Sequence, residues 1–401
     1  DQIIHEMKDR PTHIQLIKSD ITTGEQVIGA HIEIRDLDGN VLYTWVSDGT
    51  AHDLTGILNS DTSYIMHEEG APNGYHYTAD IKFYVPKDYK GIVKVKMEDH
   101  ATDIWISKKS ATTGEEIPGA KLKLTDANGD IIDEWISTSE SHKITGKLIA
   151  GRKYYLHEEA APNGYYYAET VEFTVNKDYE GTQKVEMKDD VIKAVISKKD
   201  ITNGEELPGA HIQIKDEDGN IIEEWTSSDT PHEITGKLEA GKTYIMHEEG
   251  APDGYGYSED IKFKVPNKNE GIIKVEMKDK PTHAEFKKTD ATTSKELPGA
   301  HIQIKDEDGN IIEEWTSTDK EHIIEGKLSV DKIYTMHEEG APDGYTYTDD
   351  IKFKVDRDGT TIYVYNESTK EWKKADDSTV EMKDNPTHIQ FKKTDATTSE
   401  E

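Results

Sequence analysis

A nine-residue motif recurs four times in this chain and constrains its fold more than any other feature. HEEGAPNGY begins at His67, a close variant begins at His157, and HEEGAPDGY begins at both His247 and His337. Successive copies are 90 residues apart. This period is too long for one turn of a solenoid and suits an independently folded domain. The chain is therefore predicted to be a tandem array of four similar domains.

The boundaries of these domains follow from matching both ends of the chain to the repeat. His5–Asp9 matches Val275–Asp279, which ends a repeat, and the segment from Pro386 restarts one. We therefore expect a piece of a longer array. The predicted segments are 1–11, the last strand of a preceding repeat; 12–100, 101–190, 191–280 and 281–385, the four complete repeats, the last with an extra hairpin; and 386–401, the first strand of a following repeat.

Each repeat has the sequence pattern of short β-strands separated by tight turns. Apolar residues alternate along the expected strands, and turns such as Asp38-Gly39-Asn40 separate them. Only 33% of the residues are hydrophobic, which favours several thin cores over one large core. We therefore predict an all-β chain of four Ig-like antiparallel β-sandwiches. The clearest expected strands of repeat one are His31–Arg35, Val41–Ser47, Ser63–His67, Asp80–Val85 and Ile92–Met97.

The joins between repeats are short. Asp279–Thr282 links two repeats without a Gly/Ser tether, and Pro281 within it stiffens the join. We therefore expect an elongated, semi-rigid, monomeric rod.

The charge and composition exclude several classes of partner. The chain has 81 Asp plus Glu and 48 Lys plus Arg, a formal net charge of −33. No nucleic acid is expected as a partner, because its phosphates would be repelled. No membrane insertion is expected either, because no apolar run approaches the roughly 20 residues that span a bilayer. Cysteine is absent, which excludes disulfides, thiol catalysis and thiolate metal sites.

Strand parity places three ionisable residues in the predicted core of repeat one. Lys18, Glu68 and Asp99 each share a strand face with the apolar residues two and four positions earlier. Lys, Glu and Asp are almost never fully buried unless they are paired. The trio recurs at the same phase in every repeat, so its inward orientation needs a physical reason. The later trios are Lys108, Glu158 and Asp189; Lys198, Glu248 and Asp279; and Lys288, Glu338 and Asp384.

The residues alone leave two interpretations of the trio open. The first is a buried salt bridge, or three side chains that reach solvent at the end of the sandwich. The second is chemistry, because burial favours a neutral amine and a protonated carboxyl group. These two groups can form an amide with loss of water, while the Glu shares a proton with the Asp and carries protons away from the amine. Such a crosslink would restrict the unfolded chain as a disulfide does.

At these residues the sequence resembles the B-type repeats of collagen-binding adhesins and the prealbumin-like domains of Gram-positive pilins. The shared motifs are Lys18-Ser19-Asp20, Leu207–Ala210 and Glu68–Tyr75, and the resemblance covers all four repeats. It implies prealbumin-like β-sandwiches, each with an isopeptide bond between a first-strand Lys and a last-strand Asp. By position it implies the donors Lys18, Lys108, Lys198 and Lys288, the acceptors Asp99, Asp189, Asp279 and Asp384, and the assisting, catalytic residues Glu68, Glu158, Glu248 and Glu338.

This chain departs from the family pattern in two ways. The acceptor is Asp throughout, whereas pilins more often have Asn, so the leaving group would be water rather than ammonia. In the other repeats an Asp stands two residues after the Lys, whereas repeat two has Ser110 at this position.

Other candidate sites have simpler structural explanations. The acidic residues of Asp36–Asn40 could form a calcium site. Asp-Gly is, however, a strong hairpin-turn signal, so we favour a turn at this segment. Strand alternation points His67 and its equivalents away from the Glu, so surface residues are predicted rather than metal ligands. Trp45 and its equivalents are predicted to pack in the domain or to lie on the strand surface, with a sugar-stacking platform as the weaker alternative. No metal and no cofactor are expected.

Repeat four carries 15 extra residues between Val355 and Val380. The insert contains Tyr363, Tyr365 and Trp372 around a turn, which predicts an added hairpin. Such a hairpin is decoration, a brace between domains, or a binding surface.

We predict that this chain is the structural stalk of a Gram-positive surface adhesin or pilus-like protein. The resemblance implies an extracellular protein, anchored to the cell wall through regions outside this chain. No turnover enzyme is expected, because the amide would form autocatalytically once per domain. The alternative is that the repeats are themselves adhesive modules for a host or matrix protein, with the repeat-four hairpin as the contact. A calcium-stiffened rod is a weaker third hypothesis.

Overall fold

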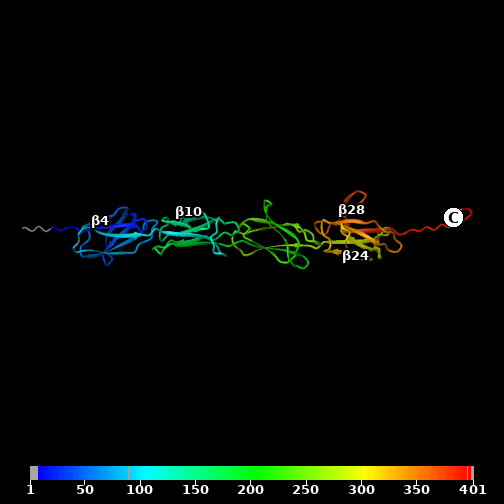
Figure 1. Ribbon diagram of the computed structural model, residues 1–401, viewed down its shortest axis with the longest axis horizontal. Coiled ribbons are helices and arrows are strands. Elements are labelled where there is room, and N and C mark those ends of the chain that lie inside the picture. Colours follow the sequence, from blue (N-terminus) through cyan, green and yellow to red (C-terminus); the bar gives the residue numbers. More distant parts are fainter. Residues whose placement is uncertain (1–7, 89, 395, 399–401) are drawn as a thin grey trace, which may run out of the picture. The chain divides into compact units, whose positions relative to one another are not determined.

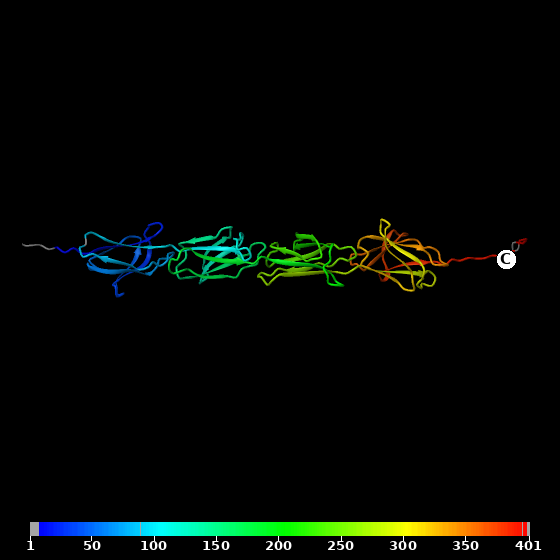
Figure 2. The same ribbon diagram turned by 60° about the horizontal axis from the view of Figure 1, so that its bottom comes forward.

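β-Strands make up nearly all of the regular structure in the residues that the computed structural model describes, which are 8–88, 90–394 and 396–398. The chain divides into two compact units. Unit 1 contains Asp1–Ile192 and Asn267–Asn269, and unit 2 contains Lys193–Pro266 and Glu270–Glu401. Repeats one and two thus belong to unit 1, in which Figure 1 labels β4 (His52–Thr55) and β10 (Ile131–Ile136). Repeats three and four belong to unit 2, in which it labels β24 (Ile311–Thr316) and β28 (Ile362–Asn366). Figure 2 shows each repeat as a separate bundle of strands. None of the residues described forms a helix long and apolar enough to cross a membrane.

Repeat one folds into two sheets that share one core. The strand orders are β4-β1-β7 and β3-β2-β5-β6. Ile14 and Leu16 from the first sheet and Ile32 and Met66 from the second belong to one buried apolar cluster. These buried residues alternate with more accessible ones along each strand, as in a two-layer sandwich. The strands are β1 (His13–Asp20), β2 (Ile28–Arg35), β3 (Val41–Asp48), β4 (His52–Thr55), β5 (Thr62–Gly70), β6 (Ile81–Val85) and β7 (Val93–Asp99).

The first and last strands of each repeat run parallel, which differs from the expected wholly antiparallel pairing. In repeat one, Lys18 on β1 lies opposite Met97 on β7, and Asp20 lies opposite Asp99. Parallel neighbours need a long crossover connection, and here the five intervening strands supply it. Residues on the same strand face are two positions apart, so the Lys18 side chain shares its face with both Met97 and Asp99.

The later repeats keep this order of strands. Repeat two contains β8 (Asp103–Ser110), β9 (Lys121–Asp126), β10 (Ile131–Ile136), β11 (His142–Thr145), β12 (Lys153–Ala160), β13 (Val171–Thr174) and β14 (Gln183–Asp189). Repeat three contains β15 (Lys193–Asp200), β16 (His211–Asp216), β17 (Ile221–Thr226), β18 (His232–Thr235), β19 (Thr243–Gly250), β20 (Ile261–Lys264) and β21 (Ile273–Asp279). Each of these repeats has a three-stranded and a four-stranded sheet.

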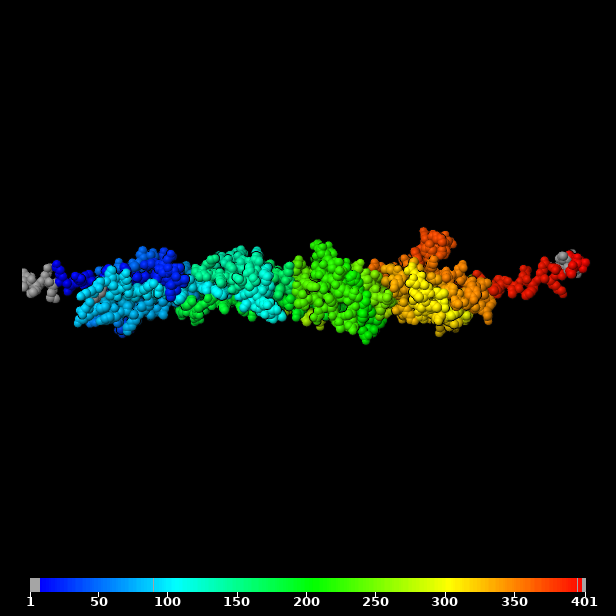
Figure 3. Space-filling view, viewed as in Figure 1, coloured from blue at the N-terminus to red at the C-terminus, as the bar shows by residue number. Residues whose placement is uncertain are grey.

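Repeat four has a larger second sheet because of its insert. The predicted hairpin is confirmed: β28 and β29 pair antiparallel and extend this sheet to six strands. The Tyr365 and Trp372 rings lie 5.2 Å apart across the hairpin, and in Figure 3 the orange-red end of this insert projects from the surface of the repeat. The strands are β22 (His283–Asp290), β23 (His301–Lys305), β24 (Ile311–Thr316), β25 (His322–Glu325), β26 (Ile333–Gly340), β27 (Ile351–Val355), β28 (Ile362–Asn366), β29 (Glu371–Lys374) and β30 (Thr379–Asp384), with the short 3₁₀ turn η1 (Asp376–Ser378) before β30.

Three further sequence-based expectations concern turns and chain ends. Asp36–Asn40 forms a turn, in which the Asp36 carboxylate accepts hydrogen bonds from the backbone N–H groups of Asp38 and Asn40 at 2.9 and 2.8 Å. The strand expected within 1–11 lies largely outside the described residues. Residues 387–394, where a first strand was expected, contain no strand.

Candidate functional site

The Lys, Glu and Asp of repeat one meet in the core. Lys18 lies on β1, Glu68 on β5, and Asp99 is the last residue of β7. Their exposed fractions are 0%, 3% and 0%, so their inward orientation agrees with strand parity. Lys18 Nζ lies 2.8 Å from Glu68 Oε1 and forms an ion pair with Asp99 Oδ1. The two sheets therefore bring three ionisable groups into direct contact.

The same geometry recurs in every repeat. The Lys Nζ lies 2.8 Å from the Glu Oε1 in repeats two, three and four, and forms an ion pair with the Asp Oδ1 each time. All three side chains of each trio are almost inaccessible to solvent. The residues brought together are Lys108, Glu158 and Asp189; Lys198, Glu248 and Asp279; and Lys288, Glu338 and Asp384.

A loop residue that the sequence analysis did not single out holds both carboxyl groups in repeat one. The backbone N–H of Thr78 donates to Glu68 Oε2 at 2.7 Å, and the Thr78 hydroxyl lies 2.6 Å from Asp99 Oδ1. Thr78 stands three residues after Tyr75 of the Pro-x-Gly-Tyr motif. A hydroxyl residue at this offset in three of the four repeats was the sequence signal that could have found it.

In each trio, one oxygen of the Asp carboxyl group has no hydrogen-bond partner among the residues that the structure describes. In repeat one this atom is Asp99 Oδ2. The Glu68 Oε1 atom, by contrast, forms an ion pair with Lys18 Nζ. A buried polar atom without a partner costs about 1–3 kcal/mol. A proton shared between the two carboxyl groups would remove this cost.

The pKa shifts agree with a proton held in the trio. Burial raises the pKa of Glu68; Lys18 opposes this rise and Asp99 adds to it. Burial likewise raises the pKa of Glu248 to about 7, and in repeat two it raises the pKa of Asp189 to about 7. Carboxyl groups that titrate near neutral pH can carry a proton in the folded protein. Each of these trios is therefore able to present a protonated carboxyl group to a buried amine.

The other candidate sites have local partners. His67 Nδ1 lies 2.6 Å from Asp80 Oδ1, and its Nε2 lies 3.2 Å from Glu69 Oε2. Within the described part of the chain, no group of three or more His, Asp or Glu side chains is arranged to hold a metal ion. Trp135 stacks on His142 with ring centroids 4.1 Å apart, so a histidine covers one face of the indole ring.

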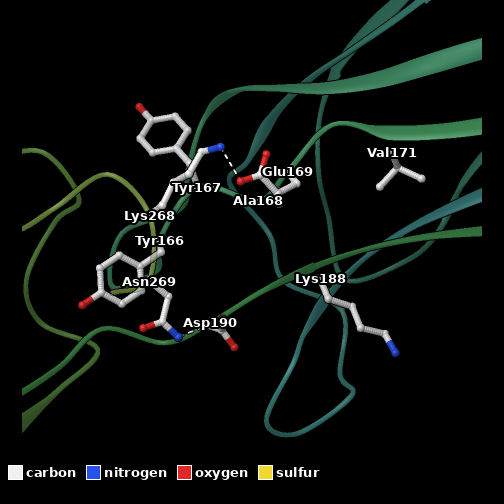
Figure 4. Close-up of a pocket in the computed structure, with 9 residues that line it drawn as sticks. All are labelled: Tyr166, Tyr167, Ala168, Glu169, Val171, Lys188, Asp190, Lys268 and Asn269. Carbon is white, nitrogen blue, oxygen red and sulfur yellow. Dashed lines mark hydrogen bonds and ion pairs between the residues drawn. The ribbon is translucent and has the colours of Figure 1, made fainter. Parts of the chain in front are cut away.

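A shallow pocket in unit 1 lies beside the loop of repeat two that contains Ala168, and Figure 4 shows the residues that line it. Its polar side chains are largely paired with one another. Lys268 pairs with Glu169, and Asn269 donates to Asp190 Oδ2 at 3.0 Å. We assign no ligand to this pocket.

Comparison with known protein families gives one match that spans most of the chain. Four consecutive segments match SpaA, described as a prealbumin-like fold domain. The matched residues are 12–101, 102–191, 193–281 and 282–370. A comparison with curated proteins gave no match.

Several solved structures are similar to parts of this chain. The Bacillus anthracis TIE protein is 20% identical, and the match covers 88% of this chain and 74% of that one with a TM-score of 0.37. The shaft pilin SpaA from Lactobacillus rhamnosus GG is 16% identical, with 50% and 98% covered and a TM-score of 0.23. The pilus adhesin SpaC from the same organism, in an open conformation, is 15% identical, with 95% and 57% covered and a TM-score of 0.33.

Proposed function

The chain belongs to the SpaA family of prealbumin-like fold domains, and from this premise we propose that it is the structural stalk of a Gram-positive surface adhesin or pilus-like protein. In this proposal each repeat is locked by an isopeptide bond between its first-strand Lys and its last-strand Asp. The protein is extracellular, and other regions attach it to the cell wall. No enzymatic turnover is involved, because each amide forms once and stays in place.

One observation carries the proposal: a buried Lys contacts a Glu and an Asp at the same positions in all four repeats. A buried ion pair is weak support for stability, because desolvation offsets most of the Coulomb attraction. Two acids facing one base are harder still to explain as a simple salt bridge. A chemical role accounts for the third group, since amide formation needs a proton carrier as well as a donor and an acceptor.

The reaction balances within the trio. Lys18 transfers a proton to the carboxylate of Glu68, which leaves a neutral amine beside the protonated Asp99. The amine nitrogen attacks the Asp99 carboxyl carbon, a C–N bond forms, and the C–O bond to Oδ2 breaks. Glu68 passes a proton to the departing oxygen, takes one from the nitrogen, and water leaves. Burial helps, because it disfavours the charged reactants and holds the reacting groups in contact.

Such a bond suits a stalk. It closes a loop from Lys18 to Asp99, a separation of 81 residues. In the chain-entropy description a crosslink over such a loop stabilises the domain by about 4–5 kcal/mol. Because β1 and β7 are neighbours in one sheet, the bond joins the first and last strands of the repeat. A tensile load along the chain would then pass through the crosslink and spare the strands between.

Intact-mass measurement of the purified full chain tests this proposal. The expected mass is lower than the calculated mass by four water molecules. A variant with Glu68, Glu158, Glu248 and Glu338 changed to Ala should show the full calculated mass. The matched control changes the adjacent, outward-facing Glu69, Glu159, Glu249 and Glu339 to Ala, and it should keep the deficit. A full mass for the unaltered chain would refute the locked stalk and leave the trios as buried ion pairs.

A second candidate function rests on the insert of repeat four. Lys354 Nζ on the neighbouring strand β27 lies 5.0 Å from the centre of the Trp372 ring and 5.8 Å from that of Tyr363, so a cation lies beside the aromatic rings of the hairpin. Such a face suits contact with a host or matrix protein. Deleting residues 360–375 and measuring attachment to immobilised matrix proteins tests this function. Unchanged attachment would remove the hairpin as the contact.

A further inference from the structure

The hydroxyl group beside the Asp carboxyl is present in repeats one, three and four and absent from repeat two. Ser258 Oγ lies 2.7 Å from Asp279 Oδ1 and Thr348 Oγ1 lies 2.6 Å from Asp384 Oδ1, as Thr78 does in repeat one. Repeat two has Ala168 at this position, and its side chain ends in a methyl group, drawn beside Glu169 in Figure 4.

The backbone N–H at this position makes the same hydrogen bond in all four repeats. The Ala168 N–H donates to Glu158 Oε2 at 2.7 Å, and the Ser258 and Thr348 N–H groups donate to their Glu Oε2 atoms at 2.8 and 3.0 Å. The loop of repeat two therefore places its Glu as the other repeats do. At this position, repeat two differs from the others in lacking the hydroxyl contact to the Asp.

The hydroxyl has one proton and two acceptors near it. Thr78 Oγ1 lies 2.6 Å from Asp99 Oδ1 and 2.9 Å from the backbone carbonyl oxygen of Glu98. When an amine attacks the Asp99 carboxyl carbon, negative charge grows on Oδ1 and draws this proton toward it. A fixed donor at an oxygen that gains charge only in the transition state lowers the barrier, because the interaction strengthens as the reaction proceeds.

We propose that the hydroxyls of Thr78, Ser258 and Thr348 are catalytic groups that stabilise the oxyanion on the Asp during amide formation, and that repeat two crosslinks more slowly because Ala168 has no such group. This inference rests on the proposed function and adds a fourth participant to each trio except that of repeat two. The C–N bond forms, Oδ1 takes the electron pair of the carbonyl group and returns it, and Oδ2 leaves in water. The hydroxyl donates a hydrogen bond throughout and keeps its proton.

A time course of crosslinking in the full chain tests the inference. The chain is made by cell-free synthesis with a short pulse of labelled amino acid, and samples are quenched in acidic denaturant at intervals. Protease digestion and mass spectrometry then give the fraction of Lys–Asp linked peptide for each repeat. Losing one oxyanion donor costs about 10²–10³ in rate in a preorganised site. We expect repeat two to lag the other three repeats by at least about tenfold.

Variants separate a catalytic hydroxyl from one that only supports the loop. Thr78→Ala should slow repeat one to the rate of repeat two, and Thr78→Ser should restore it. Ala168→Thr should accelerate repeat two, a gain that a merely structural contact in the other repeats does not predict. In each variant the three unaltered repeats of the same chain are internal controls and should keep their rates.

Three results would overturn the inference. Repeat two could crosslink as fast as the others. Ala168→Thr could leave the rate of repeat two unchanged while Ser110→Asp, the other local difference, raises it. Thr78→Ala could leave repeat one as fast as before. In all three cases the water loss itself would persist and the proposed function would stand, whereas a chain with no linked peptide in any repeat would overturn both.

Discussion

The Tyr75 hydroxyl donates a hydrogen bond to Asp20 Oδ2 at 3.0 Å, across 55 residues of sequence. Repeats three and four keep this contact, at 2.8 Å between Tyr255 and Asp200 and at 2.7 Å between Tyr345 and Asp290. It ties the Pro-x-Gly-Tyr turn to the end of the first strand, two residues beyond the buried Lys. In repeat two, Ser110 occupies the position of the Asp.

Ser110→Asp should stabilise repeat two. The new carboxylate would accept a hydrogen bond from Tyr165 and from the backbone of the following turn, as Asp20 does in repeat one. Hydrogen bonds to charged groups contribute about 1.5–3 kcal/mol. Slower amide hydrogen exchange confined to repeat two would be the sign of this gain. Its matched reversal, Asp20→Ser, should speed exchange in repeat one, and no change in either variant would contradict the prediction.

The stabilising contribution of Asp20 should disappear in acid. Burial alone would raise the pKa of this carboxyl, but hydrogen bonds from the backbone of Thr23 and Thr22 and from Tyr75 outweigh it, and the net pKa is lowered. A carboxyl whose pKa is lower in the folded state stabilises the fold above its unfolded pKa, about 3.9. That contribution is lost as the pH falls through the folded pKa.

Urea unfolding followed repeat by repeat at about pH 5 and about pH 2.5, on either side of the unfolded Asp pKa, checks this acid dependence. Repeat one should lose more stability on acidification in the unaltered chain than in Asp20→Asn, which has no proton to gain at this site. Equal losses in the two chains would show that other carboxyl groups carry the acid sensitivity.

If the proposed crosslink forms, Glu68→Ala should destabilise repeat one by about 4–5 kcal/mol through its loss over the 81-residue separation. The control is Glu69→Ala, which removes a neighbouring carboxylate that is 61% exposed and pairs with Arg35 and His67. Denaturant unfolding of repeat one, followed by hydrogen exchange, measures both changes. If Glu68→Ala costs no more than Glu69→Ala, the folded repeat draws no stability from a crosslink.

Strand parity and repetition suffice to predict the buried trio, because both are properties of the local sequence. Lys18 shares a strand face with Ile14 and Leu16 whatever the strand pairs with. The parallel pairing of β1 with β7 could not be predicted in this way, since it depends on how the chain crosses between two sheets. The orientation of the Thr78 hydroxyl could not be predicted for a related reason: Thr78 lies in a loop, where no periodicity indicates which way a side chain points.

Gly74 marks a contact between repeats one and two within unit 1. Its φ is +87°, and a Cβ added there would collide with the backbone carbonyl oxygen of Gly146. The Gly74 carbonyl oxygen also accepts a hydrogen bond from the Thr102 N–H at 2.8 Å. The same collision would occur between Gly254 and Gly326 in unit 2. A side chain at either position should therefore open the junction between two repeats and leave their cores intact.

Gly74→Ala should accelerate hydrogen exchange at the Thr102 amide by at least about tenfold, because displacing Gly146 strains the bond that protects this amide by about 1.4 kcal/mol or more. The control is Gly39→Ala, which has a similar φ of +89° but no atom within 4 Å of the added Cβ. Both variants carry the strain of an L-residue with positive φ, about 1–2 kcal/mol, so this strain cancels in the comparison. Equal exchange at Thr102 in the two variants would mean that the close approach of Gly74 to Gly146 does not hold the junction together.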